Sequence, residues 1–335
     1  MPLLTKSLLF YNGEKFSMKK FINKIKCLFK KTATETLTDS CPPDTPSPEE
    51  KPKSPKRKKH LRTLVFLSLF ITLIWYSFIF EPNNIQIENL NIEVKNLPEG
   101  FEDVKIVQLS DLHSYGFDNR EKKVLEMVRQ INPDFIFITG DLIDHSTKDM
   151  DSVQTFWQEL GRQYPEKVFV VLGNHEHNNI YIDSKSTKKR LTESGIVVLD
   201  NENQKIFQDE KYIYLVGVDD PRSGKDDLKK ALENTEKDIP KILLAHSPEI
   251  IYSPNNPKEE KVDLILTGHT HGGQVKFPFL RAFWIPTKDR GKFDSGLFEV
   301  NGTPLYVNHG IGLSGLPIRF NCPPEITVIE LEKKL

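Results

Sequence analysis

The most constraining feature of this sequence is a short segment that ends an apolar run and carries two histidines. Residues 268–274 read G-H-T-H-G-G-Q and directly follow the apolar run 262–267. In an extended segment the side chains at i and i+2 point to one face, so His269 and His271 are predicted to reach one centre. The flanking glycines permit a sharp turn and a close approach to a bound group. Alone, this H-x-H pattern indicates a metal only weakly.

Similar polar clusters follow four other predicted strands, and together they strengthen the indication. Carboxyl ends of strands are where open α/β sheets place their ligand crevice. Carboxylates, imidazoles and an amide oxygen without a thiolate suit Mn²⁺, Fe or Zn²⁺. The clusters are Asp111 and His113 after residues 105–109, Asp141 and Asp144 after 134–139, Asn174 and His175 after 167–172, and His246 after 241–244.

These potential ligands are more than one ion with an open position needs. Two divalent ions that share a carboxylate are the more economical interpretation. Two ions about 3.5–4 Å apart polarise a phosphoryl oxygen, generate hydroxide near neutral pH and stabilise an in-line transition state. The residue types and positions therefore predict hydrolysis of a phosphoester.

Strands and helices are predicted to alternate from Asp103 onward, which indicates an α/β fold of two packed sheets with helices outside. Residues 81–335 are predicted to form this catalytic domain. We expect helices at 119–131, 151–163, 184–194 and 226–234, and strands at 105–109, 134–139, 167–172, 196–199, 205–207, 212–216, 241–244, 262–266, 295–300, 304–307 and 325–331.

The first 62 residues differ in charge from the rest of the chain. They hold 15 Lys and Arg against 6 Asp and Glu, whereas the remainder holds 31 against 41. Residues 15–31 have the pattern of a basic amphipathic helix on an anionic membrane surface, with a solvated helix or a disordered tail as the alternatives. Residues 32–55, rich in Pro, Ser and Thr, are predicted to be a disordered linker.

Residues 64–80 contain no charge, and with Leu61 and Thr63 they are just long enough to span a bilayer. We predict an uncleaved transmembrane anchor at residues 63–80. The basic flank precedes it, so the positive-inside rule places residues 1–62 in the cytoplasm and the catalytic domain outside. The bilayer is thus an expected partner.

The ordered series D-x-H, G-D-x-x-D, G-N-H-E, H and G-H-x-H resembles the calcineurin-like metallophosphoesterases. Residues 268–274 and 310–319 resemble the bacterial membrane-associated YaeI/YkuE-type phosphodiesterases within that family. The resemblance covers roughly residues 97–331 and implies a four-layer α/β/β/α sandwich. It also implies roles for the polar residues. Asp111, His113 and His271 would hold one metal, Asn174, His246 and His269 the second, and Asp141 would bridge them.

The resemblance further implies that His175, oriented by Asp144, protonates the leaving oxygen. An imidazole held by a carboxylate is a suitable general acid near neutral pH. The sequence departs from the family pattern at Glu176, where Asp is commoner, and at His145, where many members have Arg. Phosphate contact then falls to other candidates, which are Arg281, Arg290 and Arg319, with His309 as a possible lining residue of the crevice.

Several functions fit this constellation. The first is a membrane-anchored phosphoesterase acting outside the cytoplasm on diesters, monoesters or pyrophosphates, with lipid- or envelope-linked substrates in view. A second is a UDP-2,3-diacylglucosamine-type pyrophosphatase of lipid A synthesis, but its cytoplasmic substrate conflicts with the predicted sidedness. A nuclease fits poorly with the acidic body, because binding the phosphate backbone requires clustered Lys and Arg. A non-enzymatic binding module is the remaining alternative.

Overall fold

The chain is described by a computed structural model that covers residues 10–11, 14–15, 56–253, 261–277, 282, 285–288 and 291–334. Contacts divide the chain into two compact units, Met1–Leu67 and Ser68–Leu335. In the first unit, β1 (Phe10–Tyr11) pairs antiparallel with β2 (Glu14–Lys15). The predicted amphipathic helix beyond residue 15 and the predicted linker at 32–55 lie outside the described residues.

One long apolar helix precedes the sheets. Helix α2 (Lys56–Trp75) continues through the π-helical turn η1 (Tyr76–Phe80) into α3 (Glu81–Asn83). The stretch His60–Asn83 has 24 residues and contains an 18-residue window of mean hydropathy 2.2, so its length and composition allow it to cross a membrane. The predicted span at 63–80 lies within it, and the helix runs three residues further.

Two six-stranded sheets make up the centre of the second unit. Sheet I has the order β3-β14-β4-β5-β6-β7, and sheet II has the order β12-β13-β11-β10-β9-β8. The strands of sheet I are β3 (Gln86–Val94), β14 (Glu325–Lys333), β4 (Lys105–Leu109), β5 (Phe135–Thr139), β6 (Val168–Val171) and β7 (Val197–Val198). Those of sheet II are β12 (Gly296–Val300), β13 (Thr303–Val307), β11 (Leu264–Thr267), β10 (Lys241–Leu244), β9 (Lys211–Gly217) and β8 (Glu202–Gln208).

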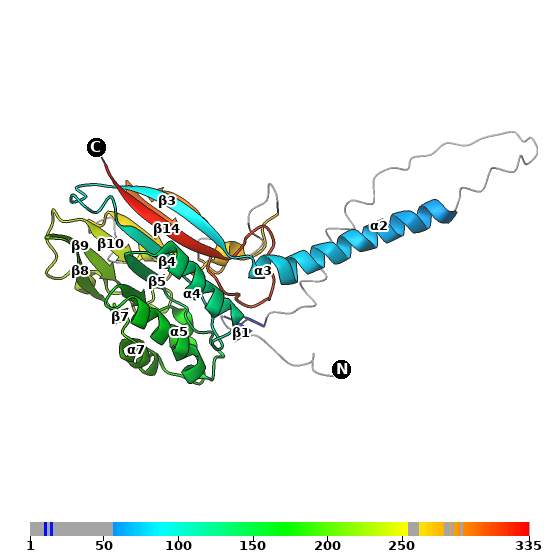
Figure 1. The fold of residues 1–335 in the computed structure, drawn as a ribbon, viewed down its shortest axis with the longest axis horizontal. Coiled ribbons are helices and arrows are strands. Elements are labelled where there is room, and N and C mark those ends of the chain that lie inside the picture. The colour runs from blue at the N-terminus through cyan, green and yellow to red at the C-terminus, as the bar shows by residue number, and fades with distance from the viewer. Residues whose placement is uncertain are drawn as a thin grey trace, which may run out of the picture. The chain divides into compact units, whose positions relative to one another are not determined.

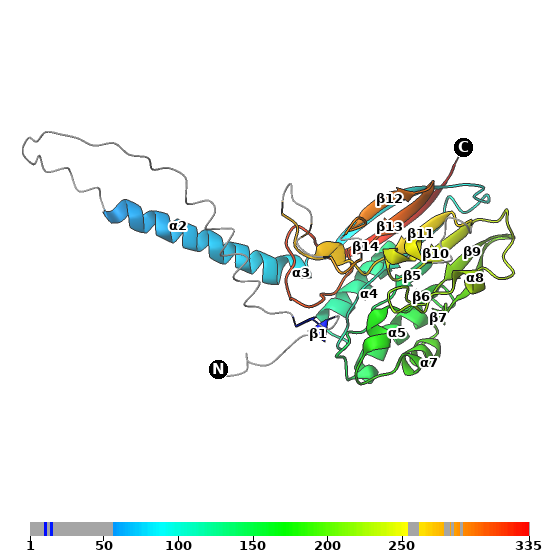
Figure 2. The same cartoon turned by 180° about the vertical axis from the view of Figure 1, so that it is seen from behind.

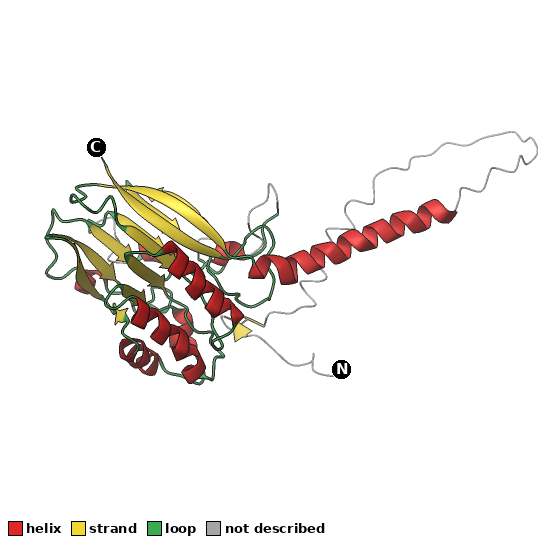
Figure 3. Ribbon diagram, viewed as in Figure 1, coloured by secondary structure: helices red, strands yellow, loops and turns green. Residues whose placement is uncertain are grey.

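The predicted four-layer α/β/β/α sandwich is confirmed. Side chains of both sheets, including Phe137 and Leu244, form a buried layer between the sheets. The outer face of sheet I packs on helices α4 (Asn119–Ile131), α5 (Met150–Gln163) and α7 (Ser184–Glu193), which lie on one side of it in Figures 1 and 3. The outer face of sheet II, seen from behind in Figure 2, packs on α8 (Leu228–Ala231) and η2 (Pro248–Tyr252).

Parallel pairing fixes where the polar clusters meet. Strands β4, β5 and β6 run parallel in sheet I, and β9, β10 and β11 run parallel in sheet II. Their apolar side chains are almost continuously buried, as expected for strands covered on both faces. Every predicted ligand therefore emerges at the carboxyl edge of one of the two sheets.

The differences from the sequence prediction include the short helix α6 (Asn174–Asn178), which was not expected, together with one shortened helix and one additional strand. The helix predicted at 226–234 is only α8, which begins after Asp227, whose side chain accepts a hydrogen bond from Lys230 N, and ends at Ala231. Strand β3 was not predicted. It is an edge strand whose side chains are mostly exposed, and it pairs in parallel with β14 along its whole length. Its polar residues hide the apolar pattern on which the prediction of a buried strand relies.

Removing a side chain from the layer between the sheets tests this architecture. Phe137→Ala should lower the free energy of unfolding by about 3–5 kcal/mol, because Phe137 is fully buried beside Phe169. Phe207→Ala is the control, since Phe207 is 55% exposed on β8, and it should change the value by less than about 0.5 kcal/mol. Urea denaturation of the detergent-solubilised chain measures both. Equal shifts would contradict the proposed layer.

Candidate metal centre

The predicted ligands converge where the carboxyl edges of the two sheets meet. The loop after β4 is tied to the loop after β5, because Asp111 N donates to Gly140 O at 3.0 Å and His113 N donates to Asp141 O at 2.9 Å. In sheet II, the loops after β10 and β11 are tied by Gly268 N, which donates to His246 O at 2.9 Å. The two sheets are joined by His269 N, which donates to Asp111 Oδ2 at 2.9 Å. Backbone bonds thus set the spacing of the ligand loops.

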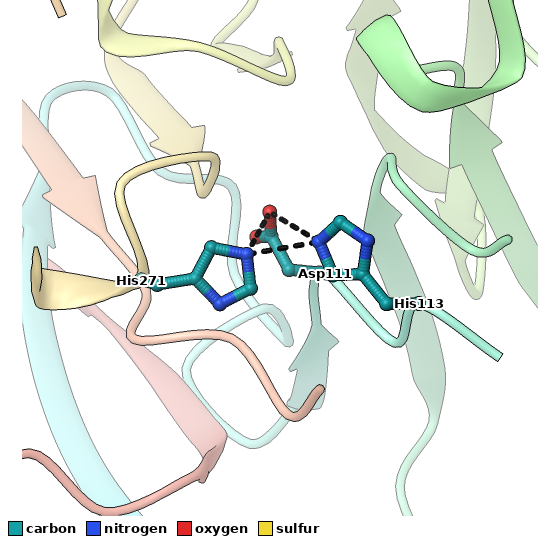
Figure 4. Close-up of side chains that lie close together, drawn as sticks. All are labelled: Asp111, His113 and His271. Carbon is teal, nitrogen blue, oxygen red and sulfur yellow. Dashed lines mark hydrogen bonds and ion pairs between the residues drawn. The ribbon is translucent and has the colours of Figure 1, made fainter. Parts of the chain in front are cut away.

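The first cluster is formed by Asp111, His113 and His271, shown in Figure 4. The Nε2 atoms of the two imidazoles are 2.9 Å apart, and His271 Nε2 is 3.4 Å from Asp111 Oδ1. All three side chains are buried. These are the three residues that the resemblance assigns to one metal.

The second cluster consists of Asn174, His246 and His269 together with Asp141. His246 Nε2 lies 3.1 Å from Asn174 Oδ1, 3.0 Å from His269 Nδ1 and 3.2 Å from Asp141 Oδ2. Asp141 Oδ2 also lies 3.7 Å from His113 Nε2 of the first cluster. Asp141 therefore stands between the two clusters, where a bridging ligand is required.

Hydrogen bonds from His246 and His269 to main-chain carbonyls show which ring nitrogens present a lone pair to the second cluster. His246 Nδ1 lies 2.8 Å from Thr139 O and His269 Nε2 lies 3.2 Å from Pro286 O, so in the neutral rings these nitrogens carry the protons. The other two ring nitrogens then face a carboxylate and an amide oxygen as acceptors. When His246 Nε2 carries no proton, these four buried acceptors share none and fit a cation, so the residues present suit a bound metal.

Burial and the carboxylates set the charge of these groups. Burial lowers the pKa of His113 to about 3 and holds the pKa values of His269 and His271 well below the ordinary value. Burial alone would also lower the pKa of His246, but Asp141 raises it well above the ordinary value. Three imidazoles are thus neutral, as metal ligation requires, and the negative field that holds a proton on His246 equally favours a divalent cation.

The backbone of the ligand loops is unusual. Asp111, His113, Asp141, His269 and His271 all have positive φ, between 45° and 68°. Residues 269–271 are therefore not extended, contrary to the prediction that placed both histidines toward one centre. The turn instead sends His269 to the second cluster and His271 to the first. Non-glycine residues with positive φ are costly and concentrate at functional sites.

Two glycines are required by the close approach of carboxylates. A Cβ on Gly173 would lie 2.2 Å from Asp141 Oδ1, and one on Gly268 would lie 2.3 Å from Asp111 Oδ2. Neither carboxylate can withdraw without leaving its cluster. The glycines of G-N-H-E and G-H-T-H are therefore explained by the space that the ligands need.

His175 lies beside the first cluster, with its ring edge-on to His113 at a centroid distance of 4.4 Å. Its Nδ1 accepts a hydrogen bond from His145 N at 3.0 Å and is 3.6 Å from Asp144 Oδ2. Burial alone would lower the pKa of His175, but Asp141 and Asp144 raise it above the ordinary value. Because Nδ1 is oriented in this way, a proton on Nε2 points toward Asp141, whose Oδ2 is 3.9 Å away.

Glu176 ties two ligand loops together, a role that the sequence did not reveal. Its carboxylate accepts hydrogen bonds from Gly173 N at 2.7 Å, Asp141 N at 3.0 Å and Ile143 N at 3.1 Å, and it is fully buried. The only signal was its position in G-N-H-E. Its partners lie more than thirty residues upstream, except for Gly173.

The other residues predicted to contact the substrate are Arg319, His309, Arg281 and Arg290. Arg319 is fully buried, and its guanidinium donates to the carbonyls of Gly310, Gly312 and Cys322. This arrangement argues for a supporting role and against the predicted contact with phosphate. His309 is partly exposed, and its Nδ1 lies 3.0 Å from Glu325 Oε2. Arg281 and Arg290 lie outside the described residues.

Comparison with known proteins agrees with this geometry. Residues 104–273 match the calcineurin-like phosphoesterase family. The chain belongs to this family. It is 32% identical over 263 residues to the uncharacterized metallophosphoesterase YkuE of Bacillus subtilis, covering 77% of this chain and 89% of that protein. It is 32% identical to an uncharacterized metallophosphoesterase of Aquifex aeolicus, covering 75% of this chain and 93% of that protein.

A eukaryotic protein is also similar. The chain is 31% identical over 288 residues to a transmembrane protein with metallophosphoesterase domain from Danio rerio. The match covers 81% of this chain and 63% of that protein, so more than a third of the Danio rerio protein lies outside the aligned region. Membership of the family makes this chain a metal-dependent phosphoester hydrolase, and its Asp and His clusters suit divalent metal ions.

Glu176→Gln tests the tie between the ligand loops. The substitution replaces one carboxylate oxygen by an amide NH₂ that cannot accept a backbone hydrogen bond. We expect metal affinity to fall by about 10–100-fold, because loop support controls ligand orientation. Glu330→Gln on the exposed side of β14 is the control. Metal content after dialysis against a chelator series, measured by mass spectrometry, reports the effect. Unchanged metal retention in Glu176→Gln would contradict this role.

Proposed function

We propose that this protein is a membrane-anchored phosphoesterase with two metal ions, which hydrolyses phosphodiester, phosphomonoester or pyrophosphate bonds. The observation that carries the proposal is the placement of Asp141 between two buried clusters. Each cluster offers two imidazoles and one further oxygen ligand. Asp111, His113 and His271 would hold one ion, and Asn174, His246 and His269 the other. Mn, Fe and Zn ions suit these ligands.

The chain's own residues divide the remaining work. Bound divalent ions would polarise the phosphoryl oxygen and lower the pKa of the attacking water. In its imidazolium form, which Asp141 and Asp144 favour, His175 would donate its Nε2 proton to the leaving oxygen and remain as a neutral imidazole whose Nδ1 faces Asp144. Asp144 is itself held, because its Oδ1 accepts hydrogen bonds from Ser146 N and Ser146 Oγ.

Membrane anchoring is supported by the apolar helix His60–Asn83 and by the Danio rerio relative, which is named as a transmembrane protein. The direction of insertion follows from charge. Seven Lys and Arg occupy residues 51–62, whereas residues 81–100 contain one lysine. The positive-inside rule therefore places the N-terminus in the cytoplasm and the catalytic domain outside. This sidedness favours a lipid- or envelope-linked phosphoester as substrate and argues against nucleic acid.

Hydrolysis of model esters by the purified full chain tests the proposed activity. Bis-(p-nitrophenyl) phosphate and p-nitrophenyl phosphate are compared after chelation and after addition of Mn²⁺, Zn²⁺ or Mg²⁺. We expect metal-dependent turnover that Asp141→Asn reduces by at least about 10³-fold, because the bridging ligand is lost. Asp151→Asn, at an exposed position on α5, should retain full activity. Equal activity of Asp141→Asn and the parent chain would refute the proposal.

The role of His175 is tested with two leaving groups. A p-nitrophenolate leaves readily without a proton, whereas an alkoxide does not. His175→Asn should therefore slow hydrolysis of an alkyl diester by about 10²–10⁴-fold and of the p-nitrophenyl diester much less. The two substrates serve as controls for each other. An equal loss for both would show that His175 supports the site and transfers no proton.

A further inference from the structure

The motif residue Gln274 and the run 310–319 have no role in the proposed chemistry, although both stand beside the metal ligands. The segment 313–320 reads L-S-G-L-P-I-R-F. Leu313, Leu316, Ile318 and Phe320 are only partly buried and Pro317 is exposed. We call residues 313–320 the apolar loop. A partly exposed loop of this composition requires an explanation, because contiguous apolar surface marks an interaction site.

Gln274 holds the apolar loop in place. Its Nε2 donates to Ser314 O at 3.0 Å and to Leu316 O at 3.1 Å, and its Oε1 accepts from Ser314 N at 2.7 Å. Its main-chain oxygen accepts from Phe320 N at 2.8 Å. One side chain, three residues after the ligand His271, thus fixes the conformation of the loop.

The other side of the apolar loop is bonded to the end of the apolar helix. Arg319 N donates to Ser77 O at 3.0 Å, and Cys322 N donates to the buried carboxylate of Glu81. The ring of Phe320 meets that of Tyr76 edge-to-face at 6.2 Å. The loop therefore continues the surface of the helix where the candidate membrane span ends.

Aromatic and aliphatic side chains extend this surface on both sides of the contact. On the helix, Tyr76 stacks on Phe80 at 5.5 Å, and Ile79 and Phe80 are 56% and 43% exposed. On the domain, Phe320 packs on Phe277 at 5.7 Å, and Phe277 is 48% exposed. The row of rings leads from the membrane helix to the segment that directly follows the G-H-T-H-G-G-Q motif.

The same loop supports the first metal cluster. Arg319 Nη2 donates to Gly310 O and Gly312 O, and it lies 3.5 Å from His271 Nδ1. Gly312 N in turn donates to Asp111 O at 2.7 Å. A loop that contacted lipid would thus hold the first cluster directly behind it.

Charge at the end of the helix also suits a lipid surface. Lys123 Nζ donates to Asn83 O at 2.8 Å, at the last residue of the candidate span, and its side chain is exposed. Basic side chains at this depth are attracted to anionic headgroups.

We propose that the apolar loop and Phe277 rest on the bilayer beside the membrane helix and hold the metal centre at headgroup level, so that the substrate is a phosphoester carried by a membrane lipid. The inference about the substrate rests on the proposed function. The bilayer is the occupant that the structure favours, because this surface is continuous with the candidate span and is flanked by a lysine.

Depth measurement in vesicles tests the contact without knowledge of the substrate. In the full chain with Cys27 and Cys41 replaced by Ser, Pro317→Cys carries an environment-sensitive fluorophore, and the one remaining native cysteine, Cys322, is fully buried. The protein is reconstituted into vesicles of phosphatidylcholine and phosphatidylglycerol that contain lipids spin-labelled near the headgroup. We expect a blue-shifted emission that the spin label quenches. Phe207→Cys, equally labelled on β8, should report water and remain unquenched.

Two results would overturn the proposed contact. A Pro317 label that emits as in water would show that the loop does not reach the bilayer. A label that is shielded from water but escapes quenching by the lipids would indicate contact with a second copy of the chain instead.

Activity of a charged variant tests the substrate class. Phe277→Asp should reduce hydrolysis of vesicle phosphatidylglycerol by about tenfold, since one apolar contact of this size is lost, while turnover of soluble bis-(p-nitrophenyl) phosphate stays within about twofold. Phe207→Asp should change neither rate. A parent chain that cleaves the soluble diester but releases no product from the vesicles would overturn the lipid substrate and leave the phosphoesterase intact. Failure to cleave either would overturn the proposed function itself.

Discussion

The structure depends on a buried concentration of acceptors at the meeting point of two sheets. Asp141 Oδ2, Asn174 Oδ1 and the inner nitrogens of His246 and His269 lie close together, with the ring protons of both imidazoles donated outward to carbonyls. Burial of such a group is costly unless a positive charge balances it. The loops of both sheets must therefore be held close together, although the acceptor atoms that they carry repel one another.

The chain meets this requirement mainly through the geometry and hydrogen bonding of its main chain. Five ligand residues adopt positive φ, two glycines leave room for carboxylate oxygens, and Glu176 joins the loops that carry Asp141 and Asn174. Each device acts within a few residues of a strand end. The strands supply the rigid frame, and the distortion is confined to the turns, where the cost of the strained backbone is offset by ligand placement.

The sequence predicted the parts of this arrangement that depend on local pattern. Polar residues that follow apolar strands can be read directly, so the order Asp111, Asp141, Asn174, His246 and His269 indicated one shared edge, and the family resemblance added the four layers. Contacts between residues that are far apart in the sequence could not be predicted. The hydrogen bonds of Glu176 and the burial of Arg319 join segments distant in sequence, and β3 escaped prediction because an edge strand needs few apolar residues.

The position of β14 has a consequence for how the protein is made. This strand is inserted between β3, which follows the apolar helix, and β4, which carries the first metal ligands at its end. Sheet I thus stays divided until residue 333 has left the ribosome. The helix and all the ligand strands are synthesised beforehand and must wait with two open strand edges. Completion of the domain is therefore late relative to synthesis of its ligand strands, and it leaves an interval in which those edges are open to other chains.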